Sequence, residues 1–419
     1  MKGWAKTTIG QLCDIGGGEV KTGPFGSQLH QSDYQYEGTP VVMPADIVDG
    51  KFDVSRVARV SDSHVDRLHK HKLSVGDIVY GRRGDIGRQA LVRAENEGWL
   101  CGTGCLRISL GNAAVLPKFL HLYLSLPDVA GWVENQAVGA TMPNLNTGIL
   151  RRVPVYFPVS KKVQHKIVSA VFAYDDLIEN NKRRITLLEK MAEEIYREWF
   201  VRLRFPGHEK VKVVKGVPEG WEIGKLGDII NLTMGQSPKS EFYNENGDGL
   251  PFNQGVGTYG DRFPKRVTFC SVDGRRAKPG DILFSVRAPV GRLNIADCDM
   301  IIGRGLAAIR HVSGKNGYLY YFMKAVFTNE DIIGNGAIFN SVGKDELNSF
   351  PILKPKDELV DKFNSVAGDV DKQIRLLFEA QERLIRTRDM LLPRLISGKL
   401  SVENLDIQFP PSMQDEAAS

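Results

Sequence analysis

Few strings in this chain combine the residue types and spacing that catalysis or cofactor binding would need. Residues 255–260, GVGTYG, have the glycine pattern of a dinucleotide-binding loop, but Pro264 follows where such a loop opens a helix. Residues 336–345, GAIFNSVGKD, have Gly-Lys without the spacing or the hydroxyl residue of a phosphate-binding loop. The Asn/Asp-Pro-Pro-aromatic string of base-methylating enzymes does not occur. The sequence therefore nominates no catalytic centre.

The candidate metal ligands are equally weak. Cys101 and Cys105 have no second Cys/His pair at ligand spacing nearby, so we expect buried structural thiols instead of a zinc site. Residues 64–71 contain three histidines, which fit a solvated basic loop. Asp14, Glu19 and Lys21 can be forced onto a nuclease pattern, but the first acid is too close and glycines fill the intended strand. We expect no metal and no cofactor bound by this chain.

The clearest chemical signal is a basic loop that occurs twice. The string GDIVYGRRGDIGR at residues 76–88 and the string GDILFSVRAPVGR at residues 280–292 each combine a turn glycine, an apolar strand and a loop with arginines. Arg83 matches Arg287, and Arg88 matches Arg292. This duplication indicates two similar units, each of which presents a basic loop.

Further matches extend the repeat over the whole chain. Trp4 precedes IGQL as Trp221 precedes LGDI, and residues 139–158 match residues 336–355 in a frame of Gly-Ala, one leucine and two prolines. The strings DIVYG, ALVRA, CLRIS, VPVYF, DILFS and LAAIR are strand candidates, whereas PKFLHLYLSL and NGYLYYFMKAV suggest short helices. We therefore predict an α+β fold with an internal pseudo-two-fold repeat, in the order globular unit, long helix, globular unit, long helix.

Two segments with almost no glycine or proline, 162–200 and 356–392, predict the long helices. Each carries apolar residues at alternating spacings of three and four, with one amide near the middle of the seam that can fix register. We expect the helices to pair as an antiparallel coiled coil, although packing of each helix on its own globular unit is the alternative. Pro393 should end or kink the second helix near Leu392, and Gly398 suits a C-terminal cap. The proposed pairing residues are Ile178, Asn181, Ile185, Leu188, Ile374, Leu377, Gln381 and Leu384.

The bulk composition limits the class of protein. The chain of 419 residues is 42% hydrophobic and 25% charged, with a net charge of +5 and five cysteines. No apolar run reaches the length of a membrane span, and the first residues have no apolar stretch of signal-peptide length. The sparse cysteines favour a reducing, cytoplasmic setting. We divide the chain into domains at residues 1–158 and 221–355, helical regions at 159–203 and 356–400, a connector at 204–220 and a polar, frayed tail at 401–419.

With the repeat in view, the chain resembles the specificity subunit of Type I restriction–modification systems. The resemblance covers nearly the whole chain in the expected order, and the duplicated order is more specific than any single string. Besides the two basic-loop strings, it rests on TGPFGSQLHQSDY (22–34), LIENNKRRITLLEKMAEEIYREWF (177–200), VPEGWEIGKLGDI (217–229), MGQSPKSEFYNENGDGLPFNQG (234–255) and LLPRLISGKL (391–400).

This resemblance implies a non-catalytic protein with two target-recognition domains, each of which reads one half of a gapped DNA site. The two helices would set the distance between the half-sites and hold two methyltransferase subunits. Those partners would bind S-adenosylmethionine and methylate adenine, and restriction subunits could join them. Two alternatives are a coiled-coil scaffold whose globular ends bind proteins, and an enzyme that modifies or cuts DNA alone.

The candidate DNA contacts are long polar side chains on glycine-flanked loops. Arginine suits guanine, glutamine suits adenine, and lysine mainly suits phosphate. We assign the matched arginines to the DNA backbone, because both units keep them, and favour unmatched residues such as Arg82, Gln28 and Gln254 for base readout. Asn144, Asn146 and Asn340 are second-rank choices. The complete set is Lys21, Ser27, Gln28, Arg82, Arg83, Arg88, Asn144, Gln236, Ser237, Lys239, Gln254, Arg287, Arg292 and Arg304.

Partner binding is expected near the end of the first long helix. Tyr196, Trp199 and Phe200 are large aromatic residues on or beside its seam, a residue type that often anchors protein interfaces.

Overall fold

The computed structural model describes residues 3–83, 86–137, 144–327 and 341–413. The chain forms two compact units: unit 1 contains residues 1–180 and 380–419, and unit 2 contains residues 181–379. This division differs from the domain limits expected from the sequence, because each unit includes part of both long helices. Each unit combines small sheets with helices, so the fold is of the mixed helix-and-sheet type.

Unit 1 contains small sheets that are mostly antiparallel. Its strands are β1 (Trp4–Thr8), β2 (Gly17–Thr22), β3 (Thr39–Val42), β4 (Ile47–Val48), β5 (Lys51–Phe52), β6 (Ala58–Val60), β7 (Ile78–Gly81), β8 (Gln89–Leu91), β9 (Leu100–Cys101), β10 (Cys105–Gly111) and β11 (Pro154–Pro158). The largest sheet has the order β2-β10-β7-β8. A second sheet, β6-β3-β9, contains one parallel pair, and two ribbons pair β1 with β11 and β4 with β5.

Unit 2 repeats much of this plan. Its strands are β12 (Val213–Val214), β13 (Val217–Pro218), β14 (Glu222–Lys225), β15 (Ile230–Met234), β16 (Tyr243–Asn244), β17 (Leu250–Asn253), β18 (Phe269–Cys270), β19 (Arg276–Ala277), β20 (Ile282–Ser285), β21 (Leu293–Ile295), β22 (Met300–Ile302), β23 (Leu306–His311) and β24 (Pro351–Lys354). The order β15-β23-β20-β21 corresponds to β2-β10-β7-β8, and the parallel pair β17·β22 corresponds to β3·β9. The ribbon β14·β24 likewise matches β1·β11.

The repeated Gly-Asp-Ile string has the same structural task in both units. Asp77 accepts a hydrogen bond from the Ser74 N–H at 2.9 Å, and Asp281 accepts one from the Lys278 N–H at 2.7 Å. Each carboxylate therefore closes the turn before the central strand, and each also faces an arginine, Arg107 or Arg310, on the neighbouring strand. Part of the sequence repeat thus maintains the fold.

The helices agree with the expected ranges, with one correction. They are α1 (Ile9–Gly16), α2 (Asp62–Arg67), α3 (Pro117–Leu124), α4 (Pro127–Gln136), α5 (Thr147–Arg152), α6 (Lys161–Tyr196), α7 (Asn316–Phe327), α8 (Lys344–Ser349) and α9 (Asp357–Ile396). A π-helical turn, Arg197–Val201, continues α6. Of the two effects predicted for Pro393, an end or a kink of the second helix near Leu392, the end is wrong, since α9 continues to Ile396. Gly398 has a φ of +72° just beyond that end, as a helix C-cap requires.

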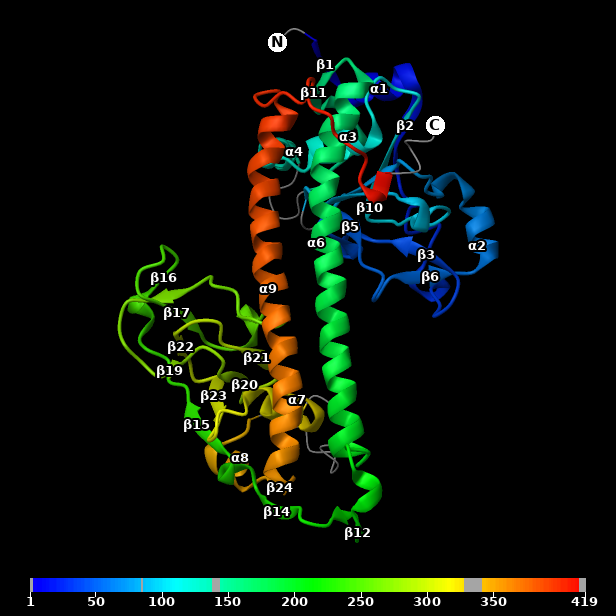
Figure 1. Cartoon of the computed structure of the whole chain (residues 1–419). Coiled ribbons are helices and arrows are strands. Elements are labelled where there is room, and N and C mark those ends of the chain that lie inside the picture. The colour runs from blue at the N-terminus through cyan, green and yellow to red at the C-terminus, as the bar shows by residue number, and fades with distance from the viewer. Residues whose placement is uncertain (1–2, 84–85, 138–143, 328–340, 414–419) are drawn as a thin grey trace. The chain divides into compact units, whose positions relative to one another are not determined.

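The long helices, α6 in green and α9 in orange in Figure 1, contact each other inside each unit. In unit 1, Arg388 of α9 forms an ion pair with Asp175 of α6 at 2.7 Å. In unit 2, Trp199 packs edge-on against Phe363 of α9 with ring centroids 5.9 Å apart. Of the proposed pairing residues, Ile178, Asn181, Ile374 and Leu377 are buried, and Ile185, Leu188, Gln381 and Leu384 are half-buried. None of the described helices has an apolar stretch long enough to span a bilayer.

Residues 402–413, which follow α9, are packed, whereas we expected a frayed tail. Val402 and Met413 are buried in the core of unit 1, where they join Ile167 of α6. Lys166 donates hydrogen bonds to the carbonyl oxygens of Glu403 at 2.7 Å and Leu405 at 2.6 Å. Residues 402–413 therefore form a cover over the first turns of α6, and they contain the apolar residues that this packing needs.

Candidate nucleic-acid interface

In unit 1, backbone hydrogen bonds join the loops that carry the candidate contacts. The Arg82 N–H donates to Gly104 O at 2.8 Å, and the Leu145 N–H donates to Arg82 O at 3.0 Å. The loop after β2 is held by the Gly23 N–H, which donates to Cys105 O at 2.9 Å. The loop residues 22–28, 82–83, 86–88, 102–104 and 144–146 therefore gather at one end of the main sheet, where β2 and β7 end and β10 begins.

Unit 2 forms the same arrangement with matching bonds. The Val286 N–H donates to Gly305 O at 3.0 Å, the Val342 N–H donates to Val286 O at 2.9 Å, and the Gly235 N–H donates to Leu306 O at 2.9 Å. This scaffold brings together the loops of Gln236, Ser237, Gln254, Arg287 and Arg304. Each unit thus presents equivalent loops with different side chains, which is the geometry that two related recognition surfaces would have.

The glycines of these loops allow close packing between neighbouring loops. A Cβ added at Gly23 would lie 1.8 Å from Gly102 O, and one at Gly235 would lie 2.2 Å from Gly303 O. A Cβ at Gly303 would lie 2.9 Å from the Cα of Gln254. Only glycine fits where two loops approach this closely, so these positions hold the contact side chains in place indirectly.

The matched arginines occupy equivalent places. Arg83 and Arg287 form isolated backbone bridges with Asn144 and Ser341 respectively, and their side chains are exposed. Arg88 and Arg292 are also exposed, and their carbonyl oxygens accept the N–H groups of Gly81 and Ser285 at 2.9 and 3.0 Å. Their equivalent backbone positions are compatible with the predicted phosphate contacts, a role that stays a prediction.

Several of the unmatched candidates also brace their own loops. The Arg82 Nε donates to Asn144 Oδ1 at 3.0 Å, and Gln28 Oε1 accepts the Phe25 N–H at 3.1 Å. Ser237 Oγ accepts the Arg304 N–H at 3.1 Å. The two terminal nitrogens of Arg82 and the amide nitrogen of Gln28 are also hydrogen-bond donors. The other unmatched candidates are Ser27, Gln236, Lys239 and Gln254, which are exposed, although the Lys239 ammonium lies 3.7 Å from Glu241.

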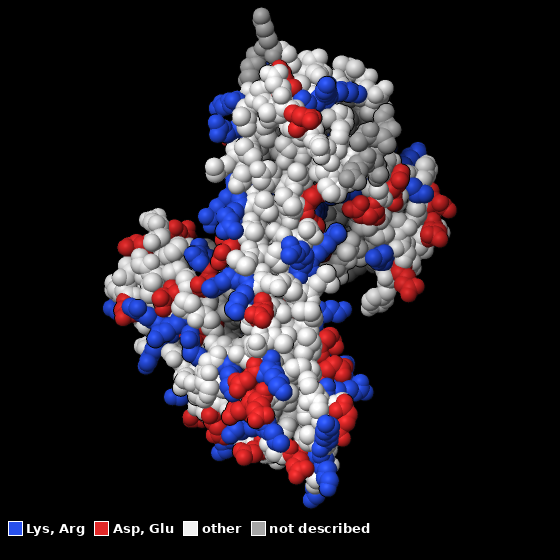
Figure 2. All heavy atoms as spheres, viewed as in Figure 1, with Lys and Arg blue, Asp and Glu red and all other residues white. Residues whose placement is uncertain are grey.

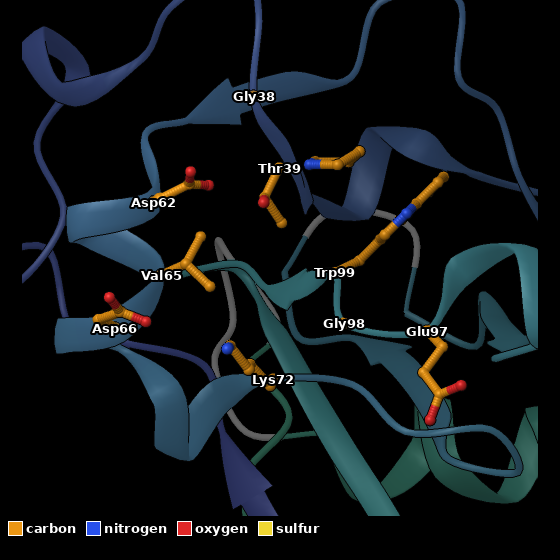
Figure 3. A pocket seen from close by; sticks show the side chains of 10 residues that line it. Gly38, Thr39, Asp62, Val65, Asp66, Lys72, Glu97, Gly98 and Trp99 are labelled. Carbon is orange, nitrogen blue, oxygen red and sulfur yellow. The ribbon is translucent and has the colours of Figure 1, made fainter.

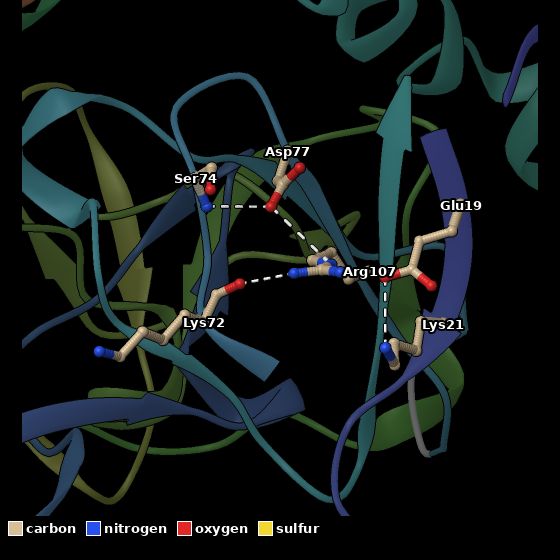
Figure 4. A network of polar contacts seen from close by, with 6 residues as sticks. All are labelled: Glu19, Lys21, Lys72, Ser74, Asp77 and Arg107. Carbon is tan, nitrogen blue, oxygen red and sulfur yellow. Dashed lines mark hydrogen bonds and ion pairs between the residues drawn. The ribbon is translucent and has the colours of Figure 1, made fainter. Parts of the chain in front are cut away.

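Lys21 belongs to a charged network in unit 1 (Figure 4), of which unit 2 repeats the contact between an arginine and the turn aspartate, Arg310 with Asp281. Its ammonium lies 3.3 Å from Glu19, which also forms an ion pair with Arg107. Arg107 in turn donates to Lys72 O at 2.6 Å and lies 3.9 Å from Asp77. The network anchors Lys21 beside the loop at residues 22–28, and it places Glu19 in ion pairs with both Lys21 and Arg107.

Thr103 is one position that the sequence reasoning missed. It lies between Gly102 and Gly104 as Arg304 lies between Gly303 and Gly305, and both loops belong to the arrangements described above. The repeated Gly-x-Gly before β10 and β23 was the available signal. Asn340, and the Gly-Ala pairs at residues 139–140 and 336–337, lie outside the described residues.

A hollow in unit 1 is a separate feature and does not suit DNA (Figure 3). It has a volume of about 470 Å³ and is lined by Asp62, Asp66, Glu97, Lys72 and Trp99, among others. Three carboxylates against one ammonium would repel phosphate groups. Figure 2 shows acidic and basic side chains interspersed over the visible face, so local loop geometry is a better guide to the interface than gross charge.

The aromatic residues predicted to bind partners are largely packed inside unit 2. Tyr196 is 4% exposed and meets Phe363 edge-on at 5.5 Å, and Phe200 lies against Tyr318 at 5.1 Å. Trp199 and Phe200 are half-buried in the same aromatic cluster. Tyr196 in particular has almost no surface to offer a partner, because tertiary packing on α7 and α9 covers it.

The structure gives structural contacts to the remaining candidate metal ligands, Cys101, Cys105 and His64. Cys101 and Cys105 are buried free thiols, and burial raises the pKa of Cys101 to about 12. His64 bonds Ser61 Oγ through Nδ1 at 2.8 Å, and its Nε2 lies 3.5 Å from Asp33. Within the described ranges, no three His, Cys, Asp or Glu side chains are grouped so that they could hold a metal ion.

Comparison with known proteins assigns this chain, with its duplicated loop arrangement, to a family. The family model of the Type I restriction modification DNA specificity domain matches residues 1–190 and again residues 218–366. The chain belongs to this family. The two matched segments coincide with the two copies of the repeat seen in the sequence and the strand order, so the family domain is present twice.

Curated relatives are similar over nearly their full length. A Methanocaldococcus jannaschii protein whose name assigns it to the specificity subunit of the type I restriction enzyme MjaX is 28% identical, over 87% of this chain and 88% of the relative. The Type I restriction enzyme MjaIX specificity subunit of the same organism is 24% identical, over 96% and 95% of the two chains. The solved S subunit of a Type-I restriction-modification system from M. genitalium shares the fold, with a TM-score of 0.59, 18% identity and coverage of 94% and 96%.

Proposed function

We propose that this chain is the DNA sequence-recognition subunit of a Type I restriction–modification complex and that it reads a bipartite, gapped site. The observation that carries the proposal is the duplicated loop arrangement, in which equivalent backbone bonds present different polar side chains in units 1 and 2. A common scaffold with different side chains is suited to reading two different half-sites. Each bidentate base contact contributes about 1–3 kcal/mol of discrimination, and contributions from separate half-sites add.

In this proposal, the two long helices pair as an antiparallel coiled coil and connect the two domains that read the half-sites. The contacts inside each unit support this pairing. In unit 1, the first half of α6 contacts the last part of α9. In unit 2, the end of α6 with its π-helical turn contacts the first part of α9. Asp175 pairs with Arg388, while Trp199 packs on Phe363. A paired-helix connection resists bending, so the two domains would accept one separation of half-sites.

The helices would also dock the methyltransferase subunits, and restriction subunits could join the complex. Exposed apolar side chains on α6 and α9 of unit 2 are better docking candidates than the packed aromatic residues. Leu187 is 66% exposed, Met191 47% and Leu376 63%. S-adenosylmethionine would be bound by the methyltransferase partner, this chain would hold no cofactor or catalytic centre, and the complex would act on cytoplasmic DNA.

The test is to express this chain with its methyltransferase subunit in an unmethylated host and to map methyladenine in the host genome. Two short specific blocks around a fixed gap are the expected result. A continuous motif would contradict a two-domain reading. The absence of methylation, with both subunits folded and associated, would favour the protein-binding scaffold, and methylation by this chain alone would favour the stand-alone enzyme.

A further inference from the structure

A hairpin-like turn in unit 2 reaches from the recognition sheets to the long helices. Tyr259 and Pro264 form an antiparallel bridge, and the tip between them contains Arg262 and Phe263. Phe263 packs edge-on against Phe378 of α9, with ring centroids 5.1 Å apart. The tip therefore lies against α9.

Arg262 is the central contact of this tip. Although it is an arginine, it is 1% exposed. Its Nη1 donates to Glu189 Oε1 of α6 at 3.1 Å, and its Nη2 forms an ion pair with Asp371 of α9. The guanidinium carbon also lies 4.1 Å from the ring centre of Tyr320 on α7. One side chain thus connects the recognition part of unit 2 to three helices.

Stability alone does not account for such a group. Removing a guanidinium and two carboxylates from water is costly, and well-packed apolar residues of similar volume often stabilise a protein as well or better. The specific contribution of the guanidinium is geometric, because its planar set of N–H groups donates hydrogen bonds to carboxylates only along fixed directions. The Arg262 cluster, defined as Arg262, Glu189 and Asp371, therefore holds the domain at one angle to α6 and α9.

Unit 1 has a weaker contact at the equivalent place. Its hairpin of β4 and β5 turns at Asp49 and Gly50, and the ammonium of Lys51, the first residue of β5, lies 2.8 Å from Glu179 of α6. These two side chains are 45% and 37% exposed. Exposed ion pairs contribute little and constrain the chain weakly. The repeat thus supplies a matched comparison between a buried and an exposed contact.

We propose that Arg262 is a positioning residue that fixes the recognition domain of unit 2 on the long helices and thereby sets the gap accepted between the half-sites. The inference rests on the proposed function. Lengthening the gap by one base pair moves the second half-site by about 3.4 Å along the DNA axis and rotates it by roughly 35°. A domain that can tilt on its helices accepts this displacement, whereas a fixed domain rejects it.

The experiment is methyladenine mapping of hosts that express the complex with variants of this chain. The decisive variant replaces the whole Arg262 cluster by apolar residues, E189M/R262M/D371L, because it leaves no unpaired buried charge. Arg262→Met alone and Arg262→Lys are the companion variants. Lys51→Met, in the equivalent hairpin of unit 1, is the matched control. Thermal unfolding of each complex reports whether the variant is folded.

We expect the apolar triple variant to remain folded and to methylate sites whose gap is one base pair too long or too short at least tenfold more often than wild type. Both half-motifs should stay unchanged, Arg262→Lys should be intermediate, and Lys51→Met should keep the wild-type gap. Wild-type gap selectivity in a folded triple variant would overturn the inference. If the wild-type complex itself yields no split motif, the proposed function fails instead, so the two failures are distinguishable.

Discussion

At the scale of single residues, the matched arginines give the most direct prediction. Arg83→Ala combined with Arg287→Ala should weaken DNA binding and lower the slope of log K against log salt by about two units, since each phosphate contact contributes roughly 0.9. Titration of specific DNA at several salt concentrations measures this slope. Lys225→Ala, which removes an exposed lysine from β14 away from the interface loops, is the control. An unchanged slope in the double variant would remove both arginines from the interface.

His121 makes the stability of unit 1 depend on pH. Burial, with a further contribution from Arg93, lowers its pKa from 6.5 to about 4, and its Nδ1 lies 2.8 Å from Gln89 Oε1. Because the unfolded chain takes up the proton first, the stability that the neutral ring contributes is present above pH 6.5 and is lost as pH falls towards 4.

Between pH 7 and pH 5 this loss amounts to about 2 kcal/mol for this histidine. His121→Gln should therefore lose about that much less than wild type over the same interval, which urea unfolding at the two pH values measures. Equal losses in the two proteins would show that other groups cause the acid sensitivity.

At the scale of elements, residues 402–413 should stabilise unit 1. Val402 and Met413 are 3% and 1% exposed, and burial of each such side chain contributes about 1.5–3 kcal/mol. A stop codon after Leu400 should therefore lower the stability of unit 1 by about 3 kcal/mol or more, seen as an earlier thermal transition. Termination after Met413 keeps the packed segment and is the control. Equal transitions in both truncations would mean that this segment contributes nothing.

The same elements show what the sequence could predict. Residues 162–200 lack glycine and proline, so the range of α6 and its π-helical turn followed from local pattern alone. The burial of Tyr196 and the packing of residues 402–413 depend on contacts with distant segments, which periodicity does not encode. The predicted helix end at Pro393 is wrong because α9 continues for three residues beyond it. Two of these residues, Leu395 and Ile396, pack in the core of unit 1. The interface loops were located by the repeat, but the packing role of Gly23 and Gly235 required the backbone.

At the scale of the whole molecule, duplication has an energetic consequence. If each unit reads its own half-site, a substitution in one unit should change the preference for one half-motif and leave the other intact. Widely separated sites contribute additively to free energy, so their discrimination ratios multiply. If both units read one continuous sequence, a substitution in one unit would instead change the preference for both parts of that sequence together.

Gln28 and Gln254 test this independence, because each lies on an exposed loop of a different unit and has no matched residue in the other. Gln28→Leu should relax one half-motif by about 1–3 kcal/mol at the affected base pair, a five- to hundredfold loss of discrimination, and Gln254→Leu should do the same to the other half. Methyladenine mapping reads both halves at once. Relaxation of both halves by one substitution would mean that the two units do not read DNA separately, whatever their common fold.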